Sequence, residues 1–256
     1  PVLCTVIGND INGIKFEKLM KDADLSTDGV IISTNRKTTV KTRVISDGKH
    51  QIRVDEEDTR PINETKNQFI KKVDSLLENT SIIILQDYNK GVLTKKIIKT
   101  LISKAKEKGI PVIVDPKKDN FLEYRECDMF KPNLKEIKEG INIEFDESKN
   151  EELKKATSLL KEKLNAKAIL LTLSGKGICI NSDDGFVHNP AYGGSVIDVS
   201  GAGDTVISVA SLLLSEGVSS ENISKISCLS GGIVCQKVGV VPIDKKELLS
   251  ETIKIF

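Results

Sequence analysis

Short apolar runs alternate with amphipathic stretches along most of the chain. The runs at residues 81–85, 112–114 and 168–173 fit strands buried on both faces. Residues 63–77, 94–106 and 151–164 carry apolar side chains at the spacing of amphipathic helices. Short loops join these segments. The alternation of strand and helix predicts an α/β fold with a largely parallel sheet.

A different pattern of polar and apolar residues lies near the start of the chain. Residues 2–7 and 16–21 predict a first strand and helix, and residues 36–45 and 51–55 then alternate between polar and apolar side chains. Asp47-Gly48 lies between the two alternating runs, as in an antiparallel hairpin. We therefore expect a small sheet over residues 30–55 that stands apart from the main sheet.

The sequence D-V-S-G-A-G-D-T at residues 198–205 carries the most specific chemistry. An apolar segment at residues 206–214 follows it and predicts a buried helix, so residues 201–203 should form the turn into the helix N-terminus. Such an end presents free N–H groups and a positive dipole to an anion. A carboxylate in the first turn, Asp204, could accept a proton from an attacking hydroxyl while the amides hold a transferring phosphoryl group. The alternative is an ordinary glycine-rich turn whose Asp is favoured by the dipole.

The same stretch resembles the second signature of the ribokinase (PfkB) family of carbohydrate kinases. The resemblance implies that Asp204 is the catalytic base and that Gly201, Ala202 and Gly203 form the anion hole. It also implies an α/β fold with a three-layer α/β/α ribokinase-like core, a small β-sheet lid at residues 30–55, and one kinase domain over residues 1–256.

Two further segments are expected near the nucleotide and its Mg²⁺. Asp115-Pro116-Lys117 follows a strand, and Lys117 could neutralise phosphate or could be a surface lysine. P-N-x-x-E at residues 132–136 has the pattern of a capping box. The family resemblance adds that Asn133 lies near the nucleotide phosphates and that Glu136 orders Mg²⁺ through water; the cap and this role can hold together.

A glycine-containing loop follows the strand at residues 168–173. T-L-S-G-K-G resembles the family's nucleotide segment, with Ser174 where glycine is frequent, and it is not a Walker loop. The resemblance assigns nucleotide contacts to Thr172, Ser174, Gly175 and Gly177.

The hairpin sequence indicates which group within the family the chain resembles. R-K-T-T-x-K-T-R, then x-I-R-V-D, and later D-Y-N-K-G are similar to the kinase half of the bacterial heptose enzymes, which phosphorylate D-glycero-β-D-manno-heptose 7-phosphate on O1 for lipopolysaccharide precursor synthesis. Basic residues in the lid could clamp a phosphorylated substrate or could be a solvated strand face. The substrate-binding candidates are Arg36, Lys41, Arg43, Asp87 and Lys90.

Composition limits the remaining possibilities. The chain has 256 residues with 38 basic and 37 acidic side chains, a balance that argues against nucleic-acid or membrane partners. Five scattered cysteines without C-x-x-C spacing fit reduced thiols in a cytoplasmic protein. With two histidines, His50 and His188, a zinc site is not expected. The cofactors expected are ATP and Mg²⁺, with a monovalent cation left open.

Three expectations concern the limits of the chain and its assembly. It opens on an apolar strand without Met, and ribokinase-like enzymes begin with an earlier strand and a sugar-contacting segment, so we expect an absent N-terminal segment. Nothing resembles the nucleotidyltransferase domain of bifunctional relatives. We expect a homodimer through the lid. The alternatives are a kinase of another sugar or sugar phosphate, or a nucleotide-binding protein without turnover.

Overall fold

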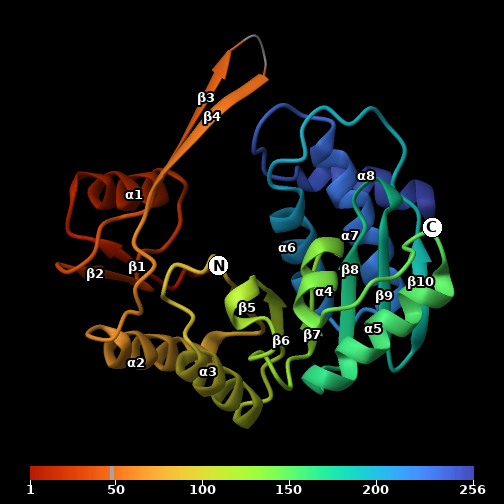
Figure 1. Ribbon diagram of the computed structural model, residues 1–256. Coiled ribbons are helices and arrows are strands. Elements are labelled where there is room, and N and C mark those ends of the chain that lie inside the picture. Colours follow the sequence, from red (N-terminus) through yellow and green to blue (C-terminus); the bar gives the residue numbers. More distant parts are fainter. Residues whose placement is uncertain (47–48) are drawn as a thin grey trace. The chain divides into compact units, whose positions relative to one another are not determined.

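The computed structural model describes residues 1–46 and 49–256, so the predicted turn at Asp47-Gly48 lies outside the described residues. The chain divides into two compact units. The N-terminal unit comprises residues 1–79 and 89–101, and the C-terminal unit comprises residues 80–88 and 102–256. Figure 1 shows the elements of each.

The N-terminal unit begins with a strand–helix–strand segment. Strands β1 (Thr5–Gly8) and β2 (Val30–Ser33) pair in parallel, and helix α1 (Ile11–Asp22) connects them. Asp10 accepts hydrogen bonds from the N–H groups of Gly13 (2.8 Å) and Thr38 (2.8 Å). This N-cap explains why α1 begins five residues before the predicted helix.

The predicted hairpin is present, with later boundaries than the expected lid. Strands β3 (Val40–Ser46) and β4 (Lys49–Glu56) form a separate two-stranded antiparallel sheet. Residues 30–33 do not belong to it, because they pair with β1. The sequence pattern could not assign residues 30–33 to one sheet, because a short apolar strand can pair in either. Helix α2 (Lys66–Leu76) and the first half of α3 (Lys95–Glu107) complete this unit.

A six-stranded mixed sheet forms the centre of the C-terminal unit, in the order β10-β9-β8-β7-β6-β5. Strands β5 to β8 are parallel to one another, and β9 pairs antiparallel with both β8 and β10. Their bounds are β5 (Ile83–Gln86), β6 (Val112–Asp115), β7 (Met129–Phe130), β8 (Ala168–Thr172), β9 (Ile178–Ser182) and β10 (Gly185–Asn189). The β9–β10 hairpin turns at residues 183–184.

Helices cover both faces of this sheet. Helices α6 and α7 pack against each other and against one face, and α5 packs against β8 and β9 on the other (Figure 1). The three-layer α/β/α expectation is therefore confirmed. The helices of this unit are α4 (Leu134–Ile141), α5 (Asn150–Leu164), α6 (Ala202–Ser215), α7 (Ser220–Cys235) and α8 (Lys245–Ile255).

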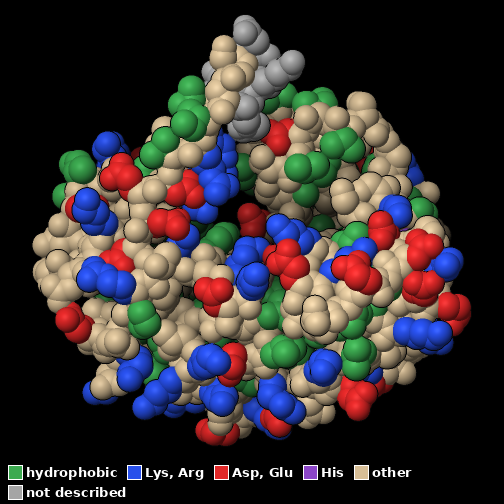
Figure 2. All heavy atoms as spheres, viewed as in Figure 1, with side chains coloured by type: hydrophobic (Ala, Val, Ile, Leu, Met, Phe, Trp, Pro, Cys, Tyr) green, Lys and Arg blue, Asp and Glu red, His purple; other side chains and the backbone are tan. Residues whose placement is uncertain are grey.

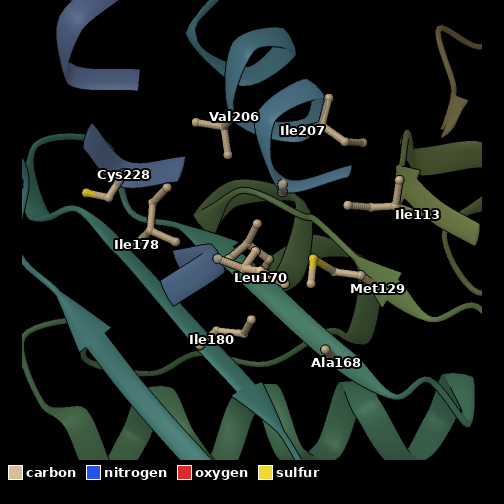
Figure 3. Close-up of a cluster of buried hydrophobic side chains, with 11 residues drawn as sticks. Ile113, Met129, Ala168, Leu170, Ile178, Ile180, Val206, Ile207 and Cys228 are labelled. Carbon is tan, nitrogen blue, oxygen red and sulfur yellow. The ribbon is translucent and has the colours of Figure 1, made fainter. Parts of the chain in front are cut away.

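A buried apolar cluster fixes α6 against the sheet. Val206 and Ile207 of α6 lie over Ile113, Leu170 and Ile178 of the strands, as Figure 3 shows. Val206 is 4% exposed and Leu170 is completely buried. Because these apolar side chains lie in the first two turns of α6, their burial fixes the helix N-terminus over the strands.

The carboxyl ends of the parallel strands lie at one edge of the sheet. Gln86 ends β5, Asp115 ends β6, Lys131 directly follows β7, and Thr172 ends β8. Ligands bind at this edge in open α/β sheets. Over the part of the chain described here, no helix is long and apolar enough to cross a membrane.

Candidate active site

The turn before α6 is built as an anion-binding helix start. Gly201 has φ +81°, a left-handed conformation that favours glycine, and α6 begins at the next residue. The carboxylate of Asp198 holds the turn by accepting the N–H groups of Ser200 (2.9 Å) and Gly239 (3.0 Å). The N–H of Ala202 donates to the Val199 carbonyl at 3.2 Å, so the groups of the first turn that can bind an anion are the N–H groups of Gly203 and Asp204.

Asp204 lies in the first turn of α6 among polar groups from the strand ends. The Gln86 amide lies 3.4 Å from its Oδ1, and the Tyr88 hydroxyl also hydrogen-bonds to it. Partial burial and the neighbouring Asp115 carboxylate raise the pKa of Asp204, while Lys131, Tyr88 and Lys117 act in the opposite direction. A raised pKa makes a carboxylate a stronger base once it is ionised. Burial and nearby carboxylates raise the pKa of Tyr88 to about 12, so it remains a hydrogen-bond donor.

A buried ion pair lies beside this base. The ammonium of Lys131 is 3.1 Å from Oδ2 of Asp115, and the two side chains are 4% and 8% exposed. The same Asp115 oxygen accepts a hydrogen bond from Gln86 at 3.0 Å. Gln86 therefore lies within reach of both carboxylates, and its amide joins them in one polar network.

Lys117, Asn133 and Glu136 form a second polar group at the same sheet edge. The predicted capping box at the start of α4 is present: Asn133 accepts the N–H of Glu136, and Glu136 accepts the N–H of Asn133, both at 2.9 Å. The other oxygen of Glu136 accepts from Lys117 at 2.7 Å. Burial lowers the pKa of Lys117, but Glu136 and the other carboxylates outweigh it, and the net shift is upward.

The donor set bears on how Mg²⁺ could be held. Both oxygens of Glu136 accept hydrogen bonds, which leaves second lone pairs that can bind metal-coordinated water. In residues 1–46 and 49–256, no three His, Cys, Asp or Glu side chains form a cluster able to hold a metal. The role of Glu136 in ordering Mg²⁺ through water stays a prediction.

The predicted nucleotide loop leaves β8 beside the start of α4. Thr172 donates its N–H to the Pro132 carbonyl at 3.1 Å, and Asn133 and Thr172 form a parallel bridge. Ser174 has φ +54°, which gives a conformational reason for glycine at this position. Gly177 has φ +93°, and a Cβ there would lie 2.1 Å from the Asn189 carbonyl oxygen. A Cβ at Gly175, in contrast, would meet open space.

Asp87 has a structural environment that the sequence did not reveal. It is 2% exposed, and its Oδ2 accepts from the Tyr124 hydroxyl (2.6 Å) and the Asn120 amide (3.0 Å). Burial and the adjacent Asp87 raise the pKa of Tyr124, so the phenol keeps its proton. These contacts fix the loop after β5 to the segment after β6, and they leave a substrate role for Asp87 as a prediction.

In the N-terminal unit, the structure brings Arg36 and Lys90 together. The Arg36 guanidinium donates to the carbonyls of Asp58 (2.8 Å) and Lys90 (2.7 Å), and burial lowers the pKa of Arg36. The Lys90 ammonium pairs with Glu57. Both side chains thus have partners within their own unit, and their assignment to substrate binding stays a prediction.

The predicted basic residues of the hairpin share one face. Lys41 is opposite Asp55, and Arg43 is opposite Arg53. Arg53 reaches Asp55 along its own strand at 3.1 Å. Two arginines directly opposite each other repel, so this face can gain free energy by binding an anion.

Four polar residues of the site received no role from the sequence: Gln86, Tyr88, Asp115 and Lys131, of which Tyr88 and Asp115 stood in motifs quoted above. A signal for them existed, because each lies at the carboxyl end of a strand or within two residues after it. Polar residues at such positions are common in loops, however, and only the packing of β5, β6, β7 and α6 brings these four together.

A helix start that can bind an anion, with a carboxylate in its first turn and basic side chains beside it, has the chemistry of phosphoryl transfer. Residues 1–246 match the pfkB family of carbohydrate kinases. The chain belongs to this family.

The chain is similar in sequence to bacterial HldE proteins. The chain is 35% identical over 246 residues to the bifunctional protein HldE of Sulfurimonas denitrificans, covering 95% of this chain and 50% of that protein. It is 32% identical over 238 residues to the HldE of Helicobacter pylori strain J99, covering 93% and 51%. The chain therefore spans about half the length of these relatives.

Solved structures agree on the fold. Escherichia coli phosphofructokinase-2 in complex with potassium superposes with a TM-score of 0.80 at 16% identity, covering 98% of this chain and 80% of that chain. Arabidopsis thaliana ribokinase complexed with ribose and ATP gives 0.78 at 20% identity, covering 97% and 80%. At these identities the likeness shows a ribokinase-like fold alone.

Proposed function

We propose that the chain catalyses ATP-dependent phosphorylation of a sugar phosphate. The substrate we favour is D-glycero-β-D-manno-heptose 7-phosphate, phosphorylated at O1 to the 1,7-bisphosphate for ADP-heptose and lipopolysaccharide core precursor synthesis. The hairpin sequence, D-Y-N-K-G at residues 87–91, and the identity to HldE proteins support this choice. The family supports the reaction class.

The observation that carries the proposal is the position of Asp204. A carboxylate with a raised pKa lies in the first turn of a helix whose free N–H groups can hold a phosphoryl group. The sugar hydroxyl would lose its proton to Asp204 as its oxygen bonds to the γ-phosphorus of ATP, and the bond to the β–γ bridging oxygen would break to release ADP. Mg²⁺, when bound, would neutralise the phosphates, with Glu136 ordering one of its waters.

The hairpin supports a substrate that already carries phosphate. Lys41, Arg43 and Arg53 share its polar face, where Asp55 lies opposite Lys41 and pairs with Arg53. A phosphate dianion would relieve the Arg43–Arg53 repulsion through charge-assisted hydrogen bonds. We therefore add Arg53 to the proposed substrate contacts.

The other hairpin face supports a homodimer. Val44 and Ile52 form a cross-strand pair and Val54 follows on the same face; they are 46%, 57% and 50% exposed. Figure 2 shows hydrophobic side chains exposed along the described part of the hairpin. A two-stranded sheet is marginal alone, and a second copy would bury this stripe. A cytoplasmic location is supported by the five free cysteines.

An ADP-release assay across acceptors tests the proposal. We expect the highest kcat/KM with heptose 7-phosphate, a lower value with unphosphorylated heptose, and release only in the presence of ATP and Mg²⁺. Faster turnover of a different sugar phosphate would identify another kinase of the same family. ATP binding without ADP release from any acceptor would favour a nucleotide-binding protein without turnover.

A further inference from the structure

Lys131 lies close to the anion-binding turn at residues 201–203, in addition to Asp204. If Gly203 carried a Cβ, its nearest neighbouring atom would be the Lys131 ammonium, at 3.7 Å. Lys131 comes from the loop after β7, a different element from the turn itself. Its side chain is 4% exposed, so its charge is shielded from bulk water.

Stability alone does not account for this lysine. A buried ion pair such as Lys131–Asp115 contributes little net stability, because removing both charges from water offsets their attraction. Apolar side chains of similar volume would serve the fold as well. The buried positive charge does have a use at this position, because it lies beside the helix N-terminus that receives the phosphoryl group.

We propose that Lys131 is a catalytic residue whose ammonium, oriented by Asp115, contacts the transferring phosphoryl group at the Gly201–Gly203 turn. The proposal rests on the proposed function, since it assumes phosphoryl transfer at this turn. Charge develops on the phosphoryl oxygens in the transition state, and a fixed cation in a water-poor site stabilises that charge without reorganisation. Asp115 is a positioning residue in this arrangement.

A planar phosphoryl mimic tests the contact without any acceptor sugar. Binding of ADP with Mg²⁺ and aluminium fluoride is measured by calorimetry and compared with binding of ADP alone. For Lys131→Met we expect about a 10²-fold or greater loss for the aluminium fluoride complex and little change for ADP. Lys135→Met, an exposed lysine on α4, is the matched control. Equal affinities for the aluminium fluoride complex in wild type and Lys131→Met would overturn the proposal.

A paired variant separates catalysis from folding. Lys131→Met alone leaves Asp115 buried without its cation, whereas Lys131→Met with Asp115→Asn removes both charges and should recover thermal stability. If Lys131 only supports the fold, binding of the mimic recovers as well, and the proposal is wrong. If it is catalytic, stability returns while the affinity for the mimic stays low.

The pH profile gives a third readout. The charged and titratable groups around Asp204 in the C-terminal unit are Asp115, Lys117, Lys131 and Tyr88. Lys131→Met removes a charge that lowers the pKa of Asp204, so the acid limb of kcat should move to higher pH by about one unit. Asp115→Asn should move it to lower pH. Shifts in the same direction, or none, would contradict the assigned contacts. Failure of the proposed substrate would appear as absent turnover with heptose 7-phosphate while the binding result above still holds.

Discussion

Asp204→Asn tests whether the basicity of Asp204, and not only its size and position, is needed for turnover. Asp204→Asn retains the size of the side chain and leaves Gln86 and Tyr88 in place as neighbours. The variant loses basicity and one negative charge. General-base catalysis contributes about 10²–10⁴-fold in rate, equivalent to roughly 3–5 kcal/mol of transition-state stabilisation. We expect kcat to fall by that factor.

Nucleotide affinity should not fall with it. The backbone N–H groups at the start of α6 remain, and Lys131 and Lys117 lose a neighbouring carboxylate that competes with phosphate for them. ATP should therefore bind as tightly as in wild type or a few-fold more tightly. Single-turnover rates and an ATP titration measure the two quantities separately.

The pH dependence of kcat gives a further test, because the direction of the expected change is known. Wild-type kcat should rise with pH through the pKa of Asp204, which lies above the ordinary aspartate value because of burial and Asp115. Asp204→Asn should lack this limb. Since the folded pKa is raised, ionisation of Asp204 costs stability as pH rises through it, so the variant should be at least as stable as wild type at neutral pH.

Two results would refute this reasoning. Turnover within a few-fold of wild type would show that another group accepts the proton. Complete loss of ATP binding would show that Asp204 is structural. Asp119→Asn, an exposed carboxylate in the segment after β6, controls for the general effect of removing a negative charge.

Three further predictions concern the hairpin and the nucleotide loop. Arg43→Ala and Lys41→Ala should raise KM for heptose 7-phosphate more than they lower kcat, because uniform binding contacts affect KM; unchanged KM in both would remove them from the site. Ile52→Asp should shift the molecular mass measured by light scattering from dimer to monomer, and a monomeric wild type at micromolar concentration would contradict the dimer. Gly177→Ala should lower the free energy of unfolding, measured by chemical denaturation, by about 1–3 kcal/mol more than Gly109→Ala does. Both glycines have positive φ, but only a Cβ at Gly177 would meet a backbone oxygen. Equal losses would show that steric conflict is absent.

The sequence alone predicted the elements that local chemistry controls. The capping box at Asn133 and Glu136 depends on groups three residues apart, and the structure contains it. The start of α6 after Gly201 follows from glycine conformation and the apolar run behind it. The buried strands β5, β6 and β8 follow from the short apolar runs in the sequence.

Boundaries and pairings that depend on distant partners were less predictable. Residues 30–33 read as part of the hairpin, yet they pair with β1, because a short apolar strand fits either sheet. Lys117 was predicted either to neutralise phosphate or to be a surface lysine, and its contact with Glu136 could not be predicted because the two residues belong to different elements; the phosphate role stays a prediction.

The charge environment of the base was decided by tertiary structure alone. Asp115 and Lys131 lie far before Asp204 in the chain, and the parallel order of β5, β6 and β7 places their ends at one edge. Burial then reduces the dielectric screening between these groups, so their charges change the pKa of Asp204. A sequence motif supplies the base and the amides, whereas the strength of the base depends on neighbours that only the folded sheet brings together.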